Sequence, residues 1–450
     1  MGVPVRAPSR FREVGSTAVV KFAAMAVAGV AGVVTSRLIV QHYGVDAFAQ
    51  YGLLTGLSSL LPFADLGIAA VLINVVAESP RPRDDPQVRR TILAALRILS
   101  VSAGVVAGTS VLLGATGLWP VLLGKGLVPG SGAAAATVSM AVFGIALPLG
   151  VGQRLLVGSG RVTLQTALSG LGSPLVLLAV IACVAATAPV GPYVAVFSYA
   201  ANAVVAALGL MVAARFLAPA VRAAARDVLK VRSVRGAPVV KVAGPMLIQM
   251  VALPIAMQTD RLLLSHLAPV AELARYNVSA QMFGLISQTL AAAGIALWPI
   301  YARARAAGRV ESPARAVLLF GAVALGLGLV LWAAMPIATQ LVTDGKIQVP
   351  WTLAVSFVLF VTVQSAKYPF GMYMTDARGL KFQVVPILVL VPINLGISWA
   401  LIAPLGAAGP VLGSAVSVIL CQLLPDWWYV RRDVAARRTR APVAVPMTRN

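Results

Sequence analysis

The chain has 450 residues, of which 59% are hydrophobic and only 11% are charged, and its mean hydropathy is +0.89. Soluble domains carry about 25% charged residues and about 45–50% apolar ones, so this composition excludes an ordinary soluble protein and indicates a chain that crosses a membrane many times. The net charge of +22 would suggest nucleic acid in a soluble protein. Here the basic residues lie in short loops between apolar segments, so we expect no nucleic-acid partner.

The apolar segments predict about twelve membrane-spanning helices, since about 20 apolar residues are needed for each crossing. The runs are too long, and alternate too little, for the strands of a barrel. The first six helices are expected near 13–40, 48–77, 91–115, 133–157, 164–187 and 190–217. The second six are expected near 239–266, 270–300, 315–341, 350–375, 383–403 and 408–430. The predicted fold is therefore an all-α polytopic membrane protein.

Basic residues follow every second predicted span, whereas the loops between carry almost none. Because cytoplasmic loops are the ones enriched in lysine and arginine, an even number of spans places both termini in the cytoplasm. The residues that carry this pattern are Arg81, Arg83, Arg89, Arg90, Arg161, Arg222, Arg226, Lys230, Arg232, Arg235, Arg303, Arg305, Arg309, Arg378, Lys381, Arg431, Arg432, Arg437, Arg438 and Arg440.

The second half of the chain repeats short patterns of the first half in the same order. VVK at 19–21 returns at 239–241, and TSRLIVQH at 35–42 is matched by TDRLLLSH at 259–266. With six spans in each half, both halves enter the membrane from the same side, so the repeats are parallel. The pattern predicts an N-terminal lobe at 1–217, a basic cytoplasmic linker at 218–238, a C-terminal lobe at 239–430 and a basic tail at 431–450.

A few charged residues fall inside the predicted spans, where an isolated charge costs on the order of 2.5–3.5 kcal/mol and usually faces a cavity or a partner. Arg37 and Arg261 occupy matching places in the two halves. Asp65 lies near the middle of the second span, between Pro62 and Gly67, where a kink is expected. Each of these residues has a structural alternative: the arginines could reach the headgroups, and Asp65 could cap a restarted helix.

Three further charged residues complete the candidate set. Asp260 cannot neutralise Arg261 within its own helix, since sequence neighbours do not share a face, so we expect it to pair across helices. Arg154 and Lys367 lie beside the interruptions PLGVGQR and KYPFG, which are typical of flexible helices in carriers, although both could be ordinary anchors at the inner interface. The basic residues outnumber the acids, so a cavity lined by them would be positive and suit an anionic ligand such as a pyrophosphate.

The sequence contains no motif of an enzyme site. It has no GxxxxGK[ST] run for nucleotide phosphates, no metal-spaced cluster of histidine and cysteine and no nucleophile elbow. We therefore expect no catalytic residue, no cofactor and no metal site. The two cysteines, Cys183 and Cys421, are expected to be packing residues inside spans.

Three stretches resemble a known family. SRLIVQHYGVDAFAQYGLLTGLSSLLPFADLGIAAVL at 36–72 is similar to the first two helices of polysaccharide repeat-unit flippases of the multidrug/oligosaccharidyl-lipid/polysaccharide (MOP) superfamily. TDRLLLSHLAPVAELARYNVSAQ at 259–281, with ALWPIYARA at 296–304, resembles their seventh and eighth helices. NLGISWALIAPLGAAGPVLGSAVS at 394–417 resembles their eleventh and twelfth.

The resemblance implies a carrier of two six-helix bundles in the bacterial cytoplasmic membrane. It would move an undecaprenyl-pyrophosphate-linked oligosaccharide to the outer leaflet, driven by H⁺, Na⁺ or the membrane potential, with a polysaccharide polymerase and glycosyltransferases as partners. Arg37, Arg261, Arg154 and Lys367 would attract the anionic headgroup, and Asp65 and Asp260 would couple the ion or pair with a basic residue. Two alternatives stay open: a cation-coupled multidrug exporter of the same superfamily, and a non-transporting membrane scaffold for glycan assembly.

Overall fold

A computed structural model of the chain describes residues 8–61, 68–228, 230, 258–295, 297–307 and 309–440. Every regular element in these ranges is a helix, which confirms the predicted all-helical fold. Ten of the described helices are long and apolar enough to cross a membrane, so the chain is a multi-pass membrane protein. The other two predicted spans, 48–77 and 239–266, include residues outside the described ranges, and the position of the termini relative to the membrane stays a prediction.

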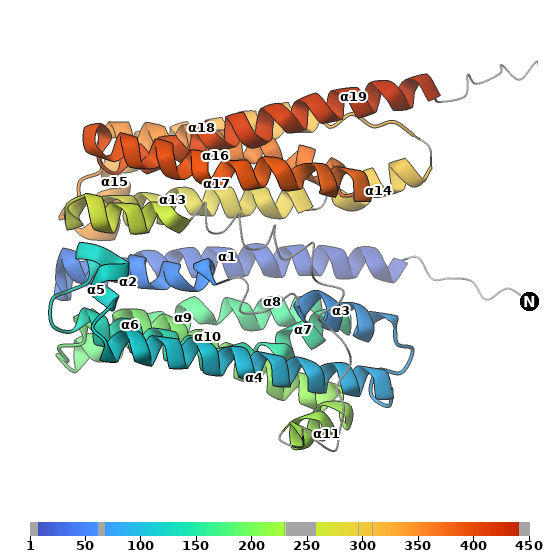
Figure 1. Ribbon diagram of the computed structural model, residues 1–450, viewed down its shortest axis with the longest axis horizontal. Coiled ribbons are helices and arrows are strands. Elements are labelled where there is room, and N and C mark those ends of the chain that lie inside the picture. Colours follow the sequence, from blue (N-terminus) through green and yellow to red (C-terminus); the bar gives the residue numbers. More distant parts are fainter. Residues whose placement is uncertain are drawn as a thin grey trace, which may run out of the picture. The chain divides into compact units, whose positions relative to one another are not determined.

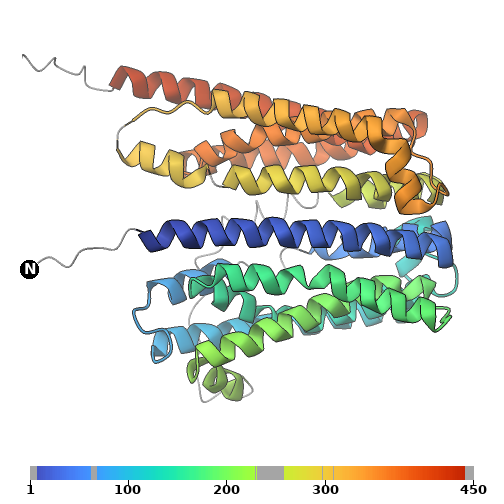
Figure 2. The same ribbon diagram turned by 180° about the vertical axis from the view of Figure 1, so that it is seen from behind.

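The chain divides into two compact units, and the first contains Met1–Ala274 together with Thr339–Ile347. Its long helices run nearly parallel to one another (Figures 1 and 2). α1 packs against α2, α8 and α9, while α10 packs against α2, α6, α7 and α9. The helices are α1 (Pro8–His42), α2 (Gly44–Leu57), α3 (Ile68–Glu78), α4 (Pro86–Ala115), α5 (Trp119–Leu123), α6 (Gly132–Leu149), α7 (Val151–Gly158), α8 (Val162–Gly170), α9 (Gly172–Ala185), α10 (Val194–Phe216) and α11 (Ala220–Asp227).

The second unit contains Arg275–Ala338 and Gln348–Asn450. In it α17 packs against α18, and α16 packs against α18 and α19. The helices that belong wholly or mostly to this unit are α13 (Val270–Ile295), α14 (Trp298–Ala306), α15 (Ala314–Thr343), α16 (Trp351–Tyr373), α17 (Ala377–Leu405), α18 (Ala408–Val418) and α19 (Leu424–Arg440). A short π-helix, Ile419–Leu423, joins α18 to α19. The predicted lobes, linker and tail are a division by sequence repeat and stay a prediction.

Local sequence explains where several helices begin and break. The Asp85 carboxylate accepts a hydrogen bond from the Gln87 backbone N–H at 2.7 Å, with Pro86 in the first turn, so α4 begins at an ordinary N-cap. The PLG stretch at 148–150 separates α6 from α7, as its proline predicts. Pro369, in contrast, lies inside the continuous helix α16, so KYPFG does not interrupt that span.

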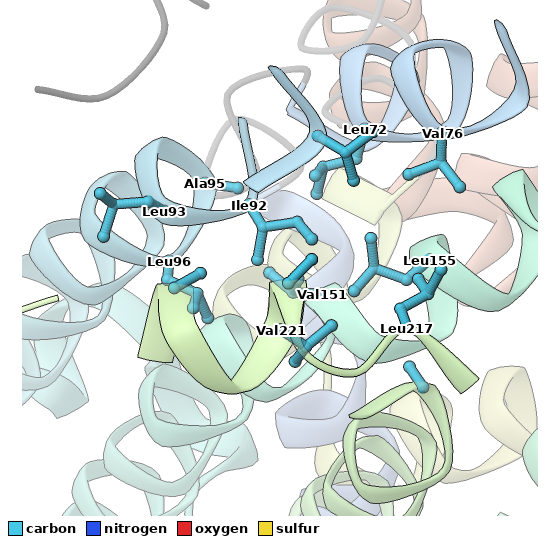
Figure 3. Close-up of a cluster of buried hydrophobic side chains, with 14 of the residues drawn as sticks. Leu72, Val76, Ile92, Leu93, Ala95, Leu96, Val151, Leu155, Leu217 and Val221 are labelled. Carbon is cyan, nitrogen blue, oxygen red and sulfur yellow. The ribbon is translucent and has the colours of Figure 1, made fainter. Parts of the chain in front are cut away.

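A cluster of buried aliphatic side chains holds one end of the first unit together. Leu72 and Val76 of α3 lie in it with Ile92 of α4, Leu155 of α7 and Val221 of α11 (Figure 3). Burying a side chain of this size stabilises a water-soluble fold by roughly 1.5–3 kcal/mol. Within a bilayer, close packing between helices replaces that transfer energy. The cluster thus includes the contact between α11 and α4.

Small residues allow the close helix approaches that membrane packing needs. A Cβ added at Gly152 of α7 would overlap the Leu210 backbone of α10, so only glycine fits there. α15, in contrast, has an exposed apolar surface, on which Leu318, Val330 and Ile337 are each more than two-thirds exposed. Such a helix face is suited to lipid rather than to water.

Candidate functional site

Arg37 of α1 forms an ion pair that was not expected from the sequence. Its Nη2 lies 3.3 Å from Oδ1 of Asp344, and its Nη1 donates to the Leu341 carbonyl at 3.4 Å. The two charged side chains are 41% and 42% exposed. Asp344 lies in the turn after α15 and has a positive φ of 55°. Arg37 therefore has an acidic neighbour of its own at the end of α1 that is predicted to face outward.

The same turn also contacts the C-terminal end of α1. Nζ of Lys346 lies 3.3 Å from the carbonyl oxygens of Val40 and Gln41. The last carbonyls of a helix lack intrahelical donors and carry the negative end of the helix dipole, so a cation there is favourable. Asp344 and Lys346 thus bind the segment Thr339–Ile347 to α1.

Arg261 lies against α2 in the first unit. Its Nη1 donates to Oε1 of Gln258 at 2.8 Å, and a Cβ added at Gly56 would lie 3.1 Å from the same nitrogen. Its neighbour Asp260 is buried, with 4% exposure. The repeat that pairs Arg37 with Arg261 has a structural counterpart in the two histidines, because Nδ1 of His42 and Nδ1 of His266 each contact the carbonyl four residues earlier.

Arg154 lies in α7, directly after the PLG break. Its Nη1 donates to the Gly150 carbonyl at 3.1 Å, so the guanidinium lies at the junction between α6 and α7. Asp65 falls outside the described residues.

Lys367 of α16 lies in a polar cluster of the second unit. Its Nζ donates to Oε1 of Gln422 at 2.6 Å. Asp426, which is 5% exposed, is close enough to attract the ammonium group electrostatically. Gln422 belongs to the π-helix between α18 and α19, a type of helix distortion that is frequent at functional sites. Asp426 lies within the span predicted at 408–430 but was not among the candidate residues named from the sequence.

The four basic candidates therefore have separate described neighbours. Arg37 forms an ion pair with Asp344, and Arg154 donates a hydrogen bond to the Gly150 carbonyl. Arg261 donates to the side-chain amide of Gln258. Lys367 donates to Gln422 and lies near Asp426. The first three belong to the first unit and Lys367 to the second. The roles assigned to these residues from the sequence stay predictions.

Comparison with known proteins identifies the fold. No protein-family model matches the chain, and no curated protein matches it in sequence. Its structure is similar to that of the lipid II flippase MurJ in an inward closed conformation, with a TM-score of 0.67 and 8% identity over 93% of this chain and 90% of that one.

Two multidrug transporters have similar structures. A multidrug resistance MATE family transporter of the MOP superfamily, in an inward-facing conformation, matches with a TM-score of 0.60 and 16% identity over 94% of this chain and 99% of that one. The Vibrio cholerae MATE transporter VcmN in its bent form matches with a TM-score of 0.53 and 15% identity over 94% and 99% of the two chains. The chain therefore has the fold shared by these MATE transporters and the lipid II flippase.

Proposed function

We propose that the chain is a flippase that moves a polyprenyl-pyrophosphate-linked oligosaccharide across the bacterial cytoplasmic membrane. The observation that carries this proposal is the scarcity of acidic residues in the membrane spans that the structure describes. The ten described spans contain three acidic residues, Glu272, Asp426 and Asp433. Asp426 lies beside Lys367, and Asp433 accepts a hydrogen bond from Arg437 at 2.6 Å.

This balance of charge favours an anionic cargo. A pyrophosphate is attracted by arginine and lysine, and arginine binds phosphate oxygens in a bidentate way. In the proposal Arg37, Arg154, Arg261 and Lys367 draw the headgroup into the protein, while Asp65 and Asp260 couple an ion or pair with a basic residue. The lipid tail stays in the bilayer. Glycosyltransferases act before the transport step, and a polymerase acts after it.

A second function, cation-coupled drug export, is favoured by two observations. The fold extends over 99% of a multidrug MATE transporter. In addition, Asp260 and Asp426 are both buried, and a buried carboxylate is the kind of group that holds a cationic drug or a coupling ion.

Transport measurements on the purified chain in proteoliposomes separate the two functions. One set of vesicles carries a fluorescent polyprenyl-pyrophosphate disaccharide, and a second set is offered ethidium under a proton or sodium gradient. We expect the protein to move the lipid probe between leaflets and to leave ethidium uptake at the level of empty vesicles. Ethidium uptake without movement of the lipid probe would overturn the flippase proposal, and movement of neither would favour a scaffold.

A further inference from the structure

A cavity of about 220 Å³ lies in the first unit, and the charged residues considered above do not line it. Six of the residues that line it carry a hydroxyl or amide group, and none of its lining residues carries a charge. The polar lining residues are Thr35, Tyr51, Ser169, Ser173, Ser198 and Asn202.

Helix geometry explains how this lining is assembled. Gly32 and Thr35 of α1 are three residues apart, and Ser198 and Asn202 of α10 are four apart, so each pair shares one helix face. Ser169 and Ser173 lie on either side of the break between α8 and α9, which is flanked by Gly170 and Gly172. These helices pack against one another, and α2 contributes Tyr51.

The hydrogen bonds of the lining leave capacity for a ligand. The Ser198 hydroxyl donates to the Tyr51 hydroxyl at 3.2 Å, and the Gln165 amide donates to Ser169 at 2.9 Å. Thr35 is 3% exposed, and its Oγ1 has no hydrogen-bond partner in the part of the chain that the structure describes. A buried polar group without a partner is unfavourable within a membrane protein unless water or a ligand satisfies it.

The chemistry of the cavity selects a class of ligand. Without a charged residue in the lining, it offers no ion pair to a pyrophosphate or to a cationic drug. Hydroxyl and amide groups both donate and accept hydrogen bonds, which suits the hydroxyl and acetamido groups of a sugar. The volume is below the roughly 300–1,000 Å³ of pockets for drug-sized ligands, so a single sugar ring is a better match than a large aromatic compound.

We infer that this cavity, formed by α1, α2, α8, α9 and α10, is a binding site for one neutral sugar unit of the transported glycan. The inference rests on the proposed flippase function, because that function brings a sugar into the protein. In the proposed flippase, the basic residues attract the pyrophosphate, and the cavity distinguishes one sugar from another.

Binding of matched lipids to the purified full-length protein in nanodiscs tests the site. The probes are polyprenyl pyrophosphate without a sugar and the same lipid carrying glucose, galactose, rhamnose or N-acetylglucosamine. We expect at least one sugar-bearing lipid to bind about tenfold more tightly than the bare lipid, as one or two additional net hydrogen bonds allow. Ser198→Ala and Asn202→Leu should remove most of this preference and leave the affinity for the bare lipid unchanged.

Ser110→Ala is the matched control. Ser110 is a buried hydroxyl of α4 in the same unit that donates to the Ala107 carbonyl at 3.0 Å and does not line the cavity. This variant should keep the sugar preference of the natural chain. A loss as large as that of Ser198→Ala would overturn the assignment to the cavity.

Cysteine protection gives a second measurement that does not depend on the two lining variants. Ser173→Cys, in a chain with Cys183→Ser and Cys421→Ala, should react more slowly with a small maleimide when the preferred sugar lipid is present than when the bare lipid is present. Equal affinity for all five lipids, or equal protection by them, would overturn the sugar site while the flippase proposal stands on the bare lipid. Binding of none of the lipids would overturn both.

Discussion

Two roles of Arg37 can be separated by mutation: attraction of the pyrophosphate and the ion pair with Asp344. Its ion pair with Asp344 is about two-fifths exposed on both sides, and such pairs stabilise proteins by roughly 0–1 kcal/mol. If Arg37 attracts the pyrophosphate, Asp344→Asn should leave both the melting temperature and transport of the lipid probe nearly unchanged. Exchanging the charges, with Arg37→Asp and Asp344→Arg, should keep the melting temperature and abolish transport.

The variant with exchanged charges could also show that Arg37 does not contact the headgroup. Recovery of transport in the exchanged pair, compared with its loss in Arg37→Asp alone, would mean that Arg37 acts only by holding the Asp344 turn. The proposed contact between Arg37 and the headgroup would then be wrong.

A substitution at Gly56 tests whether transport depends on the position of the Arg261 side chain. An added Cβ would lie 3.1 Å from the guanidinium nitrogen and 3.3 Å from Cδ, so Gly56→Ala must displace the arginine side chain. Overpacking of this kind costs about 1–3 kcal/mol in a close-packed site, although the flexible arginine can move away. We expect a small change in melting temperature and a severalfold loss of lipid transport.

Gly104→Ala in α4 is the control for Gly56→Ala. An added Cβ there meets nothing within 4 Å, and alanine is favoured over glycine inside a helix by about 1 kcal/mol. This variant should transport normally. Equal transport by the two variants would show that the position of Arg261 has no bearing on transport.

The sequence could identify basic residues in the membrane but not their partners. Arg37 and Arg261 stand out because a repeat places them at matching positions. Asp344 lies more than 300 residues from Arg37, in a turn whose path no local pattern predicts. Asp426 was not among the candidates, because the sequence alone does not show that this carboxylate, 59 residues after Lys367, is buried near the lysine.

On the scale of helices, α11 is an element whose docking should depend on pH. The Asp227 carboxylate accepts a charge-assisted hydrogen bond from Arg89 at 2.5 Å and lies 3.2 Å from Nζ of Lys230. The hydrogen bond from Arg89, followed by that from Lys230, holds the pKa of Asp227 below its ordinary value. A lowered folded-state pKa means that the pair stabilises the fold above the ordinary carboxyl pKa and that this stabilisation is lost as the pH falls through the lowered value.

Asp227→Asn should therefore lower the melting temperature at pH 7. The difference from the natural chain should shrink as the pH falls below the ordinary carboxyl pKa and toward the lowered one, because Asp227 is protonated first in the unfolded chain and then in the folded chain. Thermal unfolding in detergent from pH 7 to pH 3 measures this. A difference that stays constant over that range would contradict an electrostatic origin.

Proline and glycine standing close together did not by themselves predict a helix break. PLG correctly indicated the end of α6, but the equivalent KYPFG lies within an unbroken α16. Pro369 is four residues from the end of that helix, where losing one hydrogen bond perturbs only the last turn. The break between α8 and α9 has glycines and no proline, and a hydropathy pattern cannot distinguish it from a continuous span.

For the whole molecule, the all-helical membrane fold followed from composition and the length of apolar runs, because a bilayer admits few other backbone arrangements. The nature of the cargo does not follow from the fold, since a lipid II flippase and multidrug transporters share it. The cargo of this chain must therefore be inferred from the chemistry of its own side chains. The direction of transport depends in addition on which ends of the helices face the cytoplasm.

Orientation can be tested with single cysteines in a chain that has Cys183→Ser and Cys421→Ala. Ala186 at the end of α9 and Ala307 after α14 are both exposed. The distribution of basic loops predicts that Ala186→Cys lies outside and Ala307→Cys inside, because Arg303, Arg305 and Arg309 flank the second position. A membrane-impermeant maleimide applied to intact cells should label Ala186→Cys at once and Ala307→Cys only after permeabilisation. The reverse pattern would invert the predicted topology, and Arg37 would then meet its cargo at the cytoplasmic face, where a lipid-linked precursor is assembled, instead of at the outer one.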